Sequence, residues 1–378
     1  MINFPIDFPI TEPSIMSSGY CLLMYLICLL YSHRLSNAWN IVTIKKIPSS
    51  SIIFFVSFVG FFFITNCMNG DFFHTMGKVH AFQNTDLYFF NGEPIYREIT
   101  KFVNNNYLLF RSIVWGGAFV FFCITTRRMR IPLFLAVSTL CISYSIIFCY
   151  ARVTAAMAVY FFGISFFCSP YKYKLVGYII GLSLIYFSWQ FHTSALIMIL
   201  MTFVIFLPVK KWSIVAVVLV TPIIASYLKD YFFLFAMDED TDEFMSNKLL
   251  NYSEREVVTG FVRQITNLLT YASIYVPLYF CYKLIFSKNE ILKKDHSVIF
   301  LFKVSFGLAY AATTFLFFGE TFYTFFYRIL NMTMIPISLL LSKLYADRKL
   351  SNRLFLYCII IGMVSQLVQY SYMIYLNR

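Results

Sequence analysis

Eight ionisable side chains lie at the ends of long apolar runs or in the segments that join them: Asp71, His74, Arg152, His192, Arg255, Arg263, Glu320 and Arg328. The guanidinium group of arginine stays charged and binds phosphate oxygens through two parallel hydrogen bonds. It also stabilises the negative charge that develops when a phosphate group leaves. A histidine or glutamate nearby can take a proton from an attacking hydroxyl. Together these residue types suit a reaction on a polyanionic headgroup such as a lipid pyrophosphate.

Several of these residues also have simpler explanations. Arg263 can extend to lipid headgroups from a helix end, His192 can be satisfied within a turn, and Asp71 can cap a helix. Arg152 differs because it is the only charged residue in 131–171. A guanidinium close to a bilayer is costly, and such a residue is a functional candidate by default.

The elements that position these side chains are predicted to be membrane helices. The chain has 378 residues, of which 60% are hydrophobic and only 13% charged, whereas a soluble domain carries about 25% charged residues. We therefore expect an all-α, polytopic integral membrane protein in which residues 1–378 form a single transmembrane domain. Residues 1–12 carry two acids and no base, which is not typical of a signal peptide, so the first apolar run is expected to remain as a helix.

Apolar runs long enough to cross a bilayer follow one another along the chain. They are 13–32, 48–70, 108–126, 131–151, 153–171, 175–209, 212–228, 264–286, 297–319, 321–342 and 354–376. The run 175–209 is too long for one span, and its centre, SWQFHTS at 188–194, is polar and aromatic. Two short spans and a re-entrant pair buried in protein both fit. We therefore expect a helical hairpin there and about twelve transmembrane helices in all.

Lysine and arginine predict the orientation, because the cytoplasmic loops of membrane proteins are rich in both. With both termini outside, the inner segments hold 18 Lys and Arg residues and three acids. These inner segments are 33–48, 127–130, 172–174, 210–211, 283–296 and 343–353. We therefore expect both termini, and all eight candidate residues, on the outer side of the membrane.

Two longer outer segments, 71–107 and 229–263, are predicted to be excursions carrying short interfacial helices rather than separate domains. In the first, Pro94 suits the first turn of a helix. The apolar residues that follow recur at helical spacing and predict one apolar stripe. This stripe consists of Ile95, Ile99 and Phe102.

Neither a metal nor another cofactor is expected, and nucleic acid is not expected as a partner. The nine cysteines form no CxxC pair and the five histidines no His-x-x-x-His pair, so the usual ligand spacings of metal sites are missing. The net charge of +12 is concentrated in the inner segments, as expected for a membrane protein. Membrane lipids are the expected surroundings.

Three local patterns point to a family. The segment EPIYREITKFVNNNYLLF leads from the first outer loop into the span 108–126, Arg152 opens the small-residue helix ARVTAAMAVYFFG, and FHTSALIMIL occupies 191–200. Together with the arrangement of spans, these patterns resemble the Wzy/EpsG group of bacterial polysaccharide polymerases.

The resemblance implies a GT-C-like membrane glycosyltransferase in the bacterial inner (cytoplasmic) membrane. At the outer face, such an enzyme joins undecaprenyl-pyrophosphate-linked oligosaccharide repeat units into O-antigen or capsular polysaccharide and exopolysaccharide. It uses neither a nucleotide sugar nor a metal, and a chain-length regulator and a flippase are its expected partners.

The same resemblance suggests roles for the eight residues. Arg152 and Arg328 are expected to bind the pyrophosphate. His192 is expected to act as the base, with Glu320 as the second choice. The expected catalytic residues are Arg152, His192, Glu320 and Arg328. The expected substrate-binding residues are Arg255 and Arg263, which would guide the anionic carrier or glycan, together with Asp71 and His74.

Two other functions fit the same layout. One is a flippase or transporter of lipid-linked oligosaccharides, although such proteins usually show related halves and no internal repeat is evident in the sequence. The other is an O-antigen ligase, which shares the lipid-linked donor and a similar topology. Sequence alone separates the ligase poorly from the polymerase.

Overall fold

The computed structural model of the protein describes residues 94–103, 107–140, 151–168, 173–192, 195–203, 219–220, 223, 227, 261–286, 290–317 and 329–376. The elements of this described part are helices, which agrees with the predicted all-α class. They are α4 (Pro94–Phe102), α5 (Tyr107–Arg128), α6 (Leu133–Thr139), α8 (Ala151–Cys168), α9 (Lys174–Phe191), α10 (Ala195–Thr202), α13 (Phe261–Phe286), α14 (Glu290–Lys294), α15 (His296–Phe317), α17 (Met334–Ala346) and α18 (Asn352–Leu376).

Within the described ranges, three helical segments are long and apolar enough to cross a membrane: Gln264–Phe286, His296–Phe315 and Ile329–Ala346. Two shorter apolar helices, Val153–Cys168 and Asn352–Val368, accompany them. By the length and composition of these helices, the structure fits an α-helical membrane protein. The predicted spans 13–32, 48–70 and 212–228 lie wholly or mainly outside the described residues.

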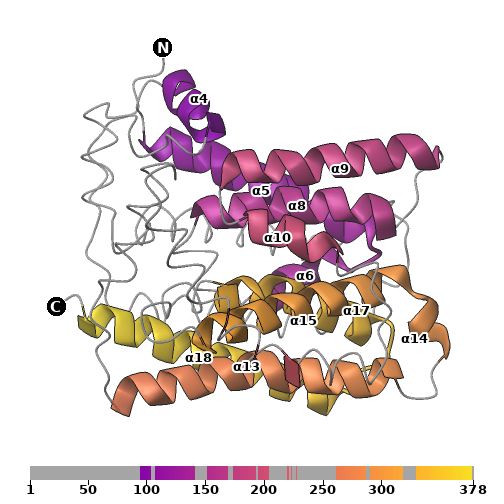
Figure 1. Cartoon of the computed structure of the whole chain (residues 1–378), viewed down its shortest axis with the longest axis vertical. Helices are drawn as coiled ribbons and strands as arrows, with labels where there is room; N and C mark the ends of the chain where they lie inside the picture. The colour runs from indigo at the N-terminus through magenta and orange to yellow at the C-terminus, as the bar shows by residue number, and fades with distance from the viewer. Residues whose placement is uncertain are drawn as a thin grey trace, which may run out of the picture.

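The long helices form two layers (Figure 1). The first contains α5, α8, α9 and α10, with α8 packed against both α5 and α9. The second contains α13, α15, α17 and α18, with α13 against α18 and α15 against α17. Contacts of α15 with α8 and α10, and of α17 with α6, join the two layers.

Small side chains hold α9 to α8. The residues that α9 buries are Gly177, Gly181, Ile185 and Ser188, which are spaced three or four residues apart and therefore form one stripe. Gly177 and Gly181 make a GxxxG pattern, which lets two helices approach closely in a membrane. The rest of α9 exposes large apolar side chains, with Leu182 57% and Tyr186 58% exposed. Soluble monomers rarely expose such a surface, whereas it suits contact with lipid.

The approach of α8 to α9 is closest at two glycines. A Cβ atom added to Gly163 of α8 would lie 2.7 Å from the carbonyl oxygen of Gly181 and 3.1 Å from the backbone nitrogen of Ile185. A Cβ atom added to Gly181 would lie 2.9 Å from the carbonyl oxygen of Gly163. Because these neighbours are backbone atoms, they cannot move aside as a flexible side chain could.

The structure confirms the predicted break within 188–194. Helix α9 ends at Phe191, and His192 has an extended backbone with φ −161° and ψ 132°. Helix α10 begins at Ala195 and contacts α9. The start of the predicted interfacial helix is also confirmed, because Pro94 is the first residue of α4.

Segments predicted to share one side of the membrane meet at one end of the bundle. The Nζ atom of Lys343 lies 3.6 Å from Oδ2 of Asp295 and 3.4 Å from Oδ2 of Asp347. It also donates to the carbonyl oxygen of Arg130 over 3.5 Å. Three predicted inner segments therefore converge on one buried ammonium group. In Figure 1, α14 lies at this end and α4 near the other.

The ammonium group of Lys343 is predicted to stabilise this end of the bundle. Its side chain is 6% exposed, whereas those of Asp295 and Asp347 are 29% and 35% exposed. Removing one member of a fully buried pair costs roughly 3–5 kcal/mol. We expect Lys343→Met to cost somewhat less, about 2 kcal/mol, because both carboxylates can reach water. Thermal unfolding in detergent measures the loss, with the exposed Lys174→Met as control. Equal melting temperatures for the two variants would contradict this role.

Candidate functional site

At the end of the bundle opposite Lys343, four helix ends meet in a small apolar cluster. Tyr96 of α4 is fully buried, and the centre of its ring lies 5.7 Å from the ring of Phe110 in α5 and 5.7 Å from that of Phe191 in α9. Ala155, in the first turns of α8, is buried in the same cluster. The start of α5, the start of α8 and the end of α9 are therefore gathered around α4.

The apolar stripe predicted for α4 is not the face of this helix that is most deeply buried. The face that packs into the protein carries Tyr96 and Thr100, and Val103 continues it just after the helix. The Thr100 hydroxyl donates to the Tyr96 carbonyl over 2.7 Å. The predicted stripe instead borders an open pocket, where Phe102 is 81% exposed. The ring of Tyr96 packs against the rings of Phe110 and Phe191, so the face of α4 that carries Tyr96 is the buried one. An outward apolar stripe is compatible with an interfacial helix.

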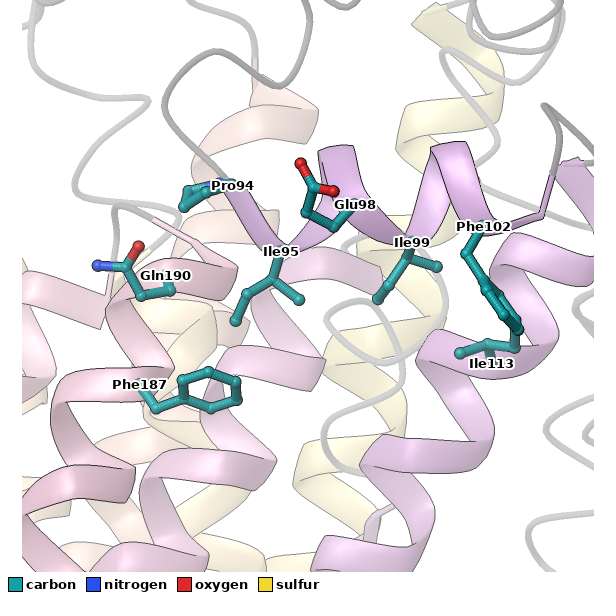
Figure 2. A pocket seen from close by; sticks show the side chains of 8 residues that line it. All are labelled: Pro94, Ile95, Glu98, Ile99, Phe102, Ile113, Phe187 and Gln190. Carbon is teal, nitrogen blue, oxygen red and sulfur yellow. The ribbon is translucent and has the colours of Figure 1, made fainter.

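The pocket beneath α4 has a volume of about 480 Å³, within the range of roughly 300–1,000 Å³ that is usual for ligand sites. Figure 2 shows α4 above it, with Ile95 and Ile99 pointing down between Phe187 of α9 and Ile113 of α5. The residues that line it are Pro94, Ile95, Glu98, Ile99, Phe102, Ile113, Phe187 and Gln190. The lining is therefore apolar, with Glu98 and Gln190 as its polar members.

Glu98, which lines the pocket, is paired with two basic residues of α4. The Lys101 ammonium donates to Oε1 of Glu98 over 2.9 Å, and Nε of Arg97 lies 3.5 Å from the same oxygen. The hydrogen bond from Lys101 holds the pKa of Glu98 below its usual value of 4.5. Glu98 is therefore ionised at neutral pH, and α4 presents charged side chains above apolar ones, as expected at the level of lipid headgroups.

His192 lies next to this pocket along the chain. Its side chain is 8% exposed, and it follows Gln190, which lines the pocket, by two residues. The His192 backbone joins α9 to α10. Its N–H donates to the Ser188 carbonyl over 3.4 Å, and its carbonyl accepts from the Ala195 N–H over 2.9 Å. The structure therefore gives the His192 backbone a turn role, two residues after a side chain that lines the pocket.

Arg152 is the second residue of α8, and its side chain lies outside the described residues. Ala155, one turn further along α8, packs in the cluster that Phe191 also contacts. The helix turn that carries Arg152 and the turn that carries His192 therefore adjoin one cluster. The N-terminus of α8 is at this end as well, and the partial positive charge of a helix N-terminus favours anions.

Arg263 belongs to a helix of the second layer. Arg263 is the third residue of α13, whose main contacts are with α14, α15, α17 and α18 in the second layer. The remaining predicted site residues, Asp71, His74, Arg255, Glu320 and Arg328, lie outside the described residues. Of the eight candidates, Arg152 and His192 are therefore the two whose helix turns lie at the same cluster in the described part of the chain.

A buried polar layer in the second half of the bundle was missed by the sequence reasoning. The Ser365 hydroxyl of α18 lies 3.5 Å from the Thr270 hydroxyl of α13, and Ser273 Oγ lies 3.9 Å from the Met334 sulfur. Asn331 is 1% exposed, and neither its Nδ2 nor its Oδ1 has a hydrogen-bond partner among the described residues. The sequence signal for this layer is the uncharged polar residues that lie within the apolar runs.

Over the described ranges, no group of three or more His, Cys, Asp or Glu side chains could hold a metal ion. The described cysteines, Cys123, Cys168, Cys281 and Cys358, are free thiols.

Comparisons of the chain with protein-family models, with curated proteins and with solved structures gave no match. The functional conclusion therefore depends on the chemistry of the residues and on their placement in the fold.

Proposed function

We propose that the protein is a membrane glycosyltransferase that polymerises oligosaccharide units carried on undecaprenyl pyrophosphate. The observation that carries the proposal is the meeting of two helix turns, those of Arg152 and His192, beside an apolar pocket under α4. A cation at a helix N-terminus suits a pyrophosphate. A histidine at the neighbouring turn suits proton transfer.

The proposed reaction transfers a glycan between two lipid-linked chains. The bond between the anomeric carbon of the growing glycan and its pyrophosphate breaks, and a new bond forms from that carbon to a hydroxyl at the non-reducing end of the next unit. His192 takes the proton of this hydroxyl, and undecaprenyl pyrophosphate leaves with the bonding electron pair. Arg152 stabilises the negative charge that develops on the leaving group. In this proposal Arg328 assists Arg152, Glu320 is the alternative base, and Arg255 guides the substrate.

The proposed enzyme also has a defined number of membrane spans and a defined orientation in the membrane. About twelve helices in a GT-C-like arrangement would cross the bacterial inner membrane, with both termini outside. The grouping of segments at the two bundle ends agrees with the predicted sidedness alone, because Lys343 gathers predicted inner segments while Tyr96 contacts Phe191 at the predicted outer end. The outer face then carries α4, His192 and the start of α8.

The experiment that tests the function is the surface-glycan ladder of the native host after deletion of the gene. A polymerase defect leaves each acceptor capped by a single repeat unit, and the wild-type gene restores the ladder. Complete loss of capped units would instead indicate a flippase or an O-antigen ligase, since either step precedes the appearance of any capped acceptor. A ladder that does not change would contradict all three functions.

A further inference from the structure

The buried polar layer in the second half of the bundle lies where two helices that contain proline pack against each other. Pro277 stands inside α13, and Pro336 lies within the apolar helical segment Ile329–Ala346 that includes α17. Proline has no N–H to donate to the carbonyl four residues earlier. The carbonyls of Ser273 and Met332 are therefore deprived of this helix bond. At membrane depth, backbone of this kind is tolerated where it is buried in protein or lines a polar cavity.

The two interrupted turns lie at the same level of the bundle. Helices α13 and α17 pack against each other, and Ser273 Oγ lies 3.9 Å from the Met334 sulfur. The two helices run in the same direction, because both end where Asp295 joins α14 to α15. One turn before the contacting residues lie Thr270 on α13 and Asn331 on the segment that leads into α17. Residues three apart share a helix face, so these two polar side chains occupy a common level.

Helix α18 contributes the third side of this layer. The Ser365 hydroxyl of α18 donates to the Thr270 hydroxyl over 3.5 Å. The buried polar side chains of the layer are uncharged and at most 3% exposed; they are Thr266, Thr270, Ser273, Asn331 and Ser365. Ser273 stands near the middle of the span Gln264–Phe286. The layer therefore lies deep within the apolar part of the bundle.

The layer is rich in hydrogen-bond acceptors. The Thr270 hydroxyl donates its proton to the Thr266 carbonyl over 2.8 Å, and the Ser273 hydroxyl donates to the Thr270 carbonyl over 2.7 Å. Each hydroxyl oxygen keeps its lone pairs as acceptors. The two carbonyls that proline deprives of an N–H add to these acceptors. Oδ1 of Asn331 is a further acceptor, without a partner among the described residues.

An amide at position 331 is costly unless something binds to it. A polar group that is buried without a hydrogen bond destabilises a protein, and a buried group of this kind points to a water, an ion or another function. A leucine at the same position would suit the apolar surroundings without this cost. The amide of Asn331 therefore indicates that the layer holds a ligand.

We propose that this layer binds a Na⁺ ion, with oxygen atoms of Thr270, Ser273, Asn331 and Met332 as its ligands. An excess of oxygen acceptors suits a cation, since hard cations take oxygen ligands. Divalent cations favour carboxylates, whereas the side chains of this layer are uncharged. Backbone carbonyls of interrupted helices near the middle of a membrane coordinate Na⁺ in other membrane proteins. A water on the ion accepts from Nδ2 of Asn331. The ion joins α13 to α17, and its site is independent of the proposed glycosyl transfer.

Equilibrium binding of radioactive Na⁺ to the purified full chain in detergent tests the site directly. Thermal unfolding in sodium, potassium and choline chloride at equal concentration gives a second readout. We expect saturable binding of Na⁺ and a higher melting temperature in sodium chloride than in either other salt. Absence of saturable binding, or equal melting temperatures in the three salts, would overturn the proposal.

Two variants and a matched control locate the ion. Asn331→Leu and Ser273→Ala each remove a ligand oxygen, so we expect Na⁺ binding to weaken by roughly tenfold or more, as when groups that support a metal site are lost. Ser305→Ala is the control, because Ser305 of α15 is also fully buried and donates to a carbonyl of its own helix over 2.7 Å. It lies two turns away from Thr313, which contacts Tyr275 of α13, and it should bind Na⁺ as the wild type does. Equal binding by all three variants would reject this location.

A bound water is the alternative occupant, and the same measurements separate it from Na⁺. With water alone, the wild-type protein binds no Na⁺, and Asn331→Leu changes the melting temperature by the same amount in every salt. That result would overturn the ion site. If Asn331→Leu does not fold, the binding measured for the wild type and for Ser273→Ala decides between the two occupants.

Discussion

Arg152→Ala is expected to reduce polymerisation by about 100- to 1,000-fold, so that the surface glycan is capped mainly by single repeat units. A preorganised group that stabilises charge in a transition state contributes roughly this factor. The residue lies in the first turn of α8, at the end of the bundle where the apolar pocket opens. Arg152→Lys should retain part of the activity, because lysine keeps the charge but loses the two-pronged hydrogen bonding of arginine. The glycan ladder of the complemented deletion strain measures both variants.

The control for this experiment is Arg127→Ala. Arg127 is an exposed arginine in the last turn of α5, in a segment predicted to lie on the inner side. It should leave the ladder unchanged. Protein levels in the membrane must match the wild type for each strain. A full-length ladder from Arg152→Ala at normal protein level would show that this arginine does not bind the leaving phosphate.

Gly163→Leu is expected to abolish the folded protein, and Gly163→Ala to reduce the free energy of unfolding by about 1–3 kcal/mol, the usual cost of overpacking. The physical reason is the distance of 2.7 Å between the added Cβ atom and the Gly181 carbonyl oxygen. To relieve this contact, α9 must move away from α8. Its buried stripe of small residues then loses its contacts along the whole helix. Thermal unfolding with fluorescence-detected gel filtration measures the effect.

Gly116→Ala provides the matched control, because its added Cβ atom meets no atom within 4 Å. Alanine favours a helix over glycine by up to about 1 kcal/mol. We therefore expect Gly116→Ala to unfold at the wild-type temperature or slightly above it. If Gly163→Ala were equally stable, the two helices would have to be further apart than the structure places them.

Local signals in the sequence predicted several features of the fold correctly. The polar and aromatic SWQFHTS marks the break after α9, because an apolar run of this length cannot continue as one span. Proline at position 94 predicted the start of α4, since its missing N–H is harmless in a first turn. Arg152 was expected to open a helix, and it is the second residue of α8.

Features that depend on distant segments could not be predicted in the same way. Lys343 and Asp295 are 48 positions apart, and nothing in either local sequence pairs them. The face of α4 that packs inward depends on the rings of Phe110 and Phe191, which surround Tyr96. A pattern within α4 alone therefore identifies its apolar stripe without showing what that stripe faces.

The contacts of α9 have a consequence for the order in which the protein is assembled. Its partners, α4, α8 and α10, all lie within about 100 positions of it, and α5 packs mainly on α8. The layer that contains the candidate site can therefore assemble as soon as residues up to 202 have entered the membrane. Helix α13, the first helix of the second layer, begins only at Phe261. The second layer would thus be added to a first layer that already holds the pocket under α4, and a defect at Gly163 would arise early in biogenesis.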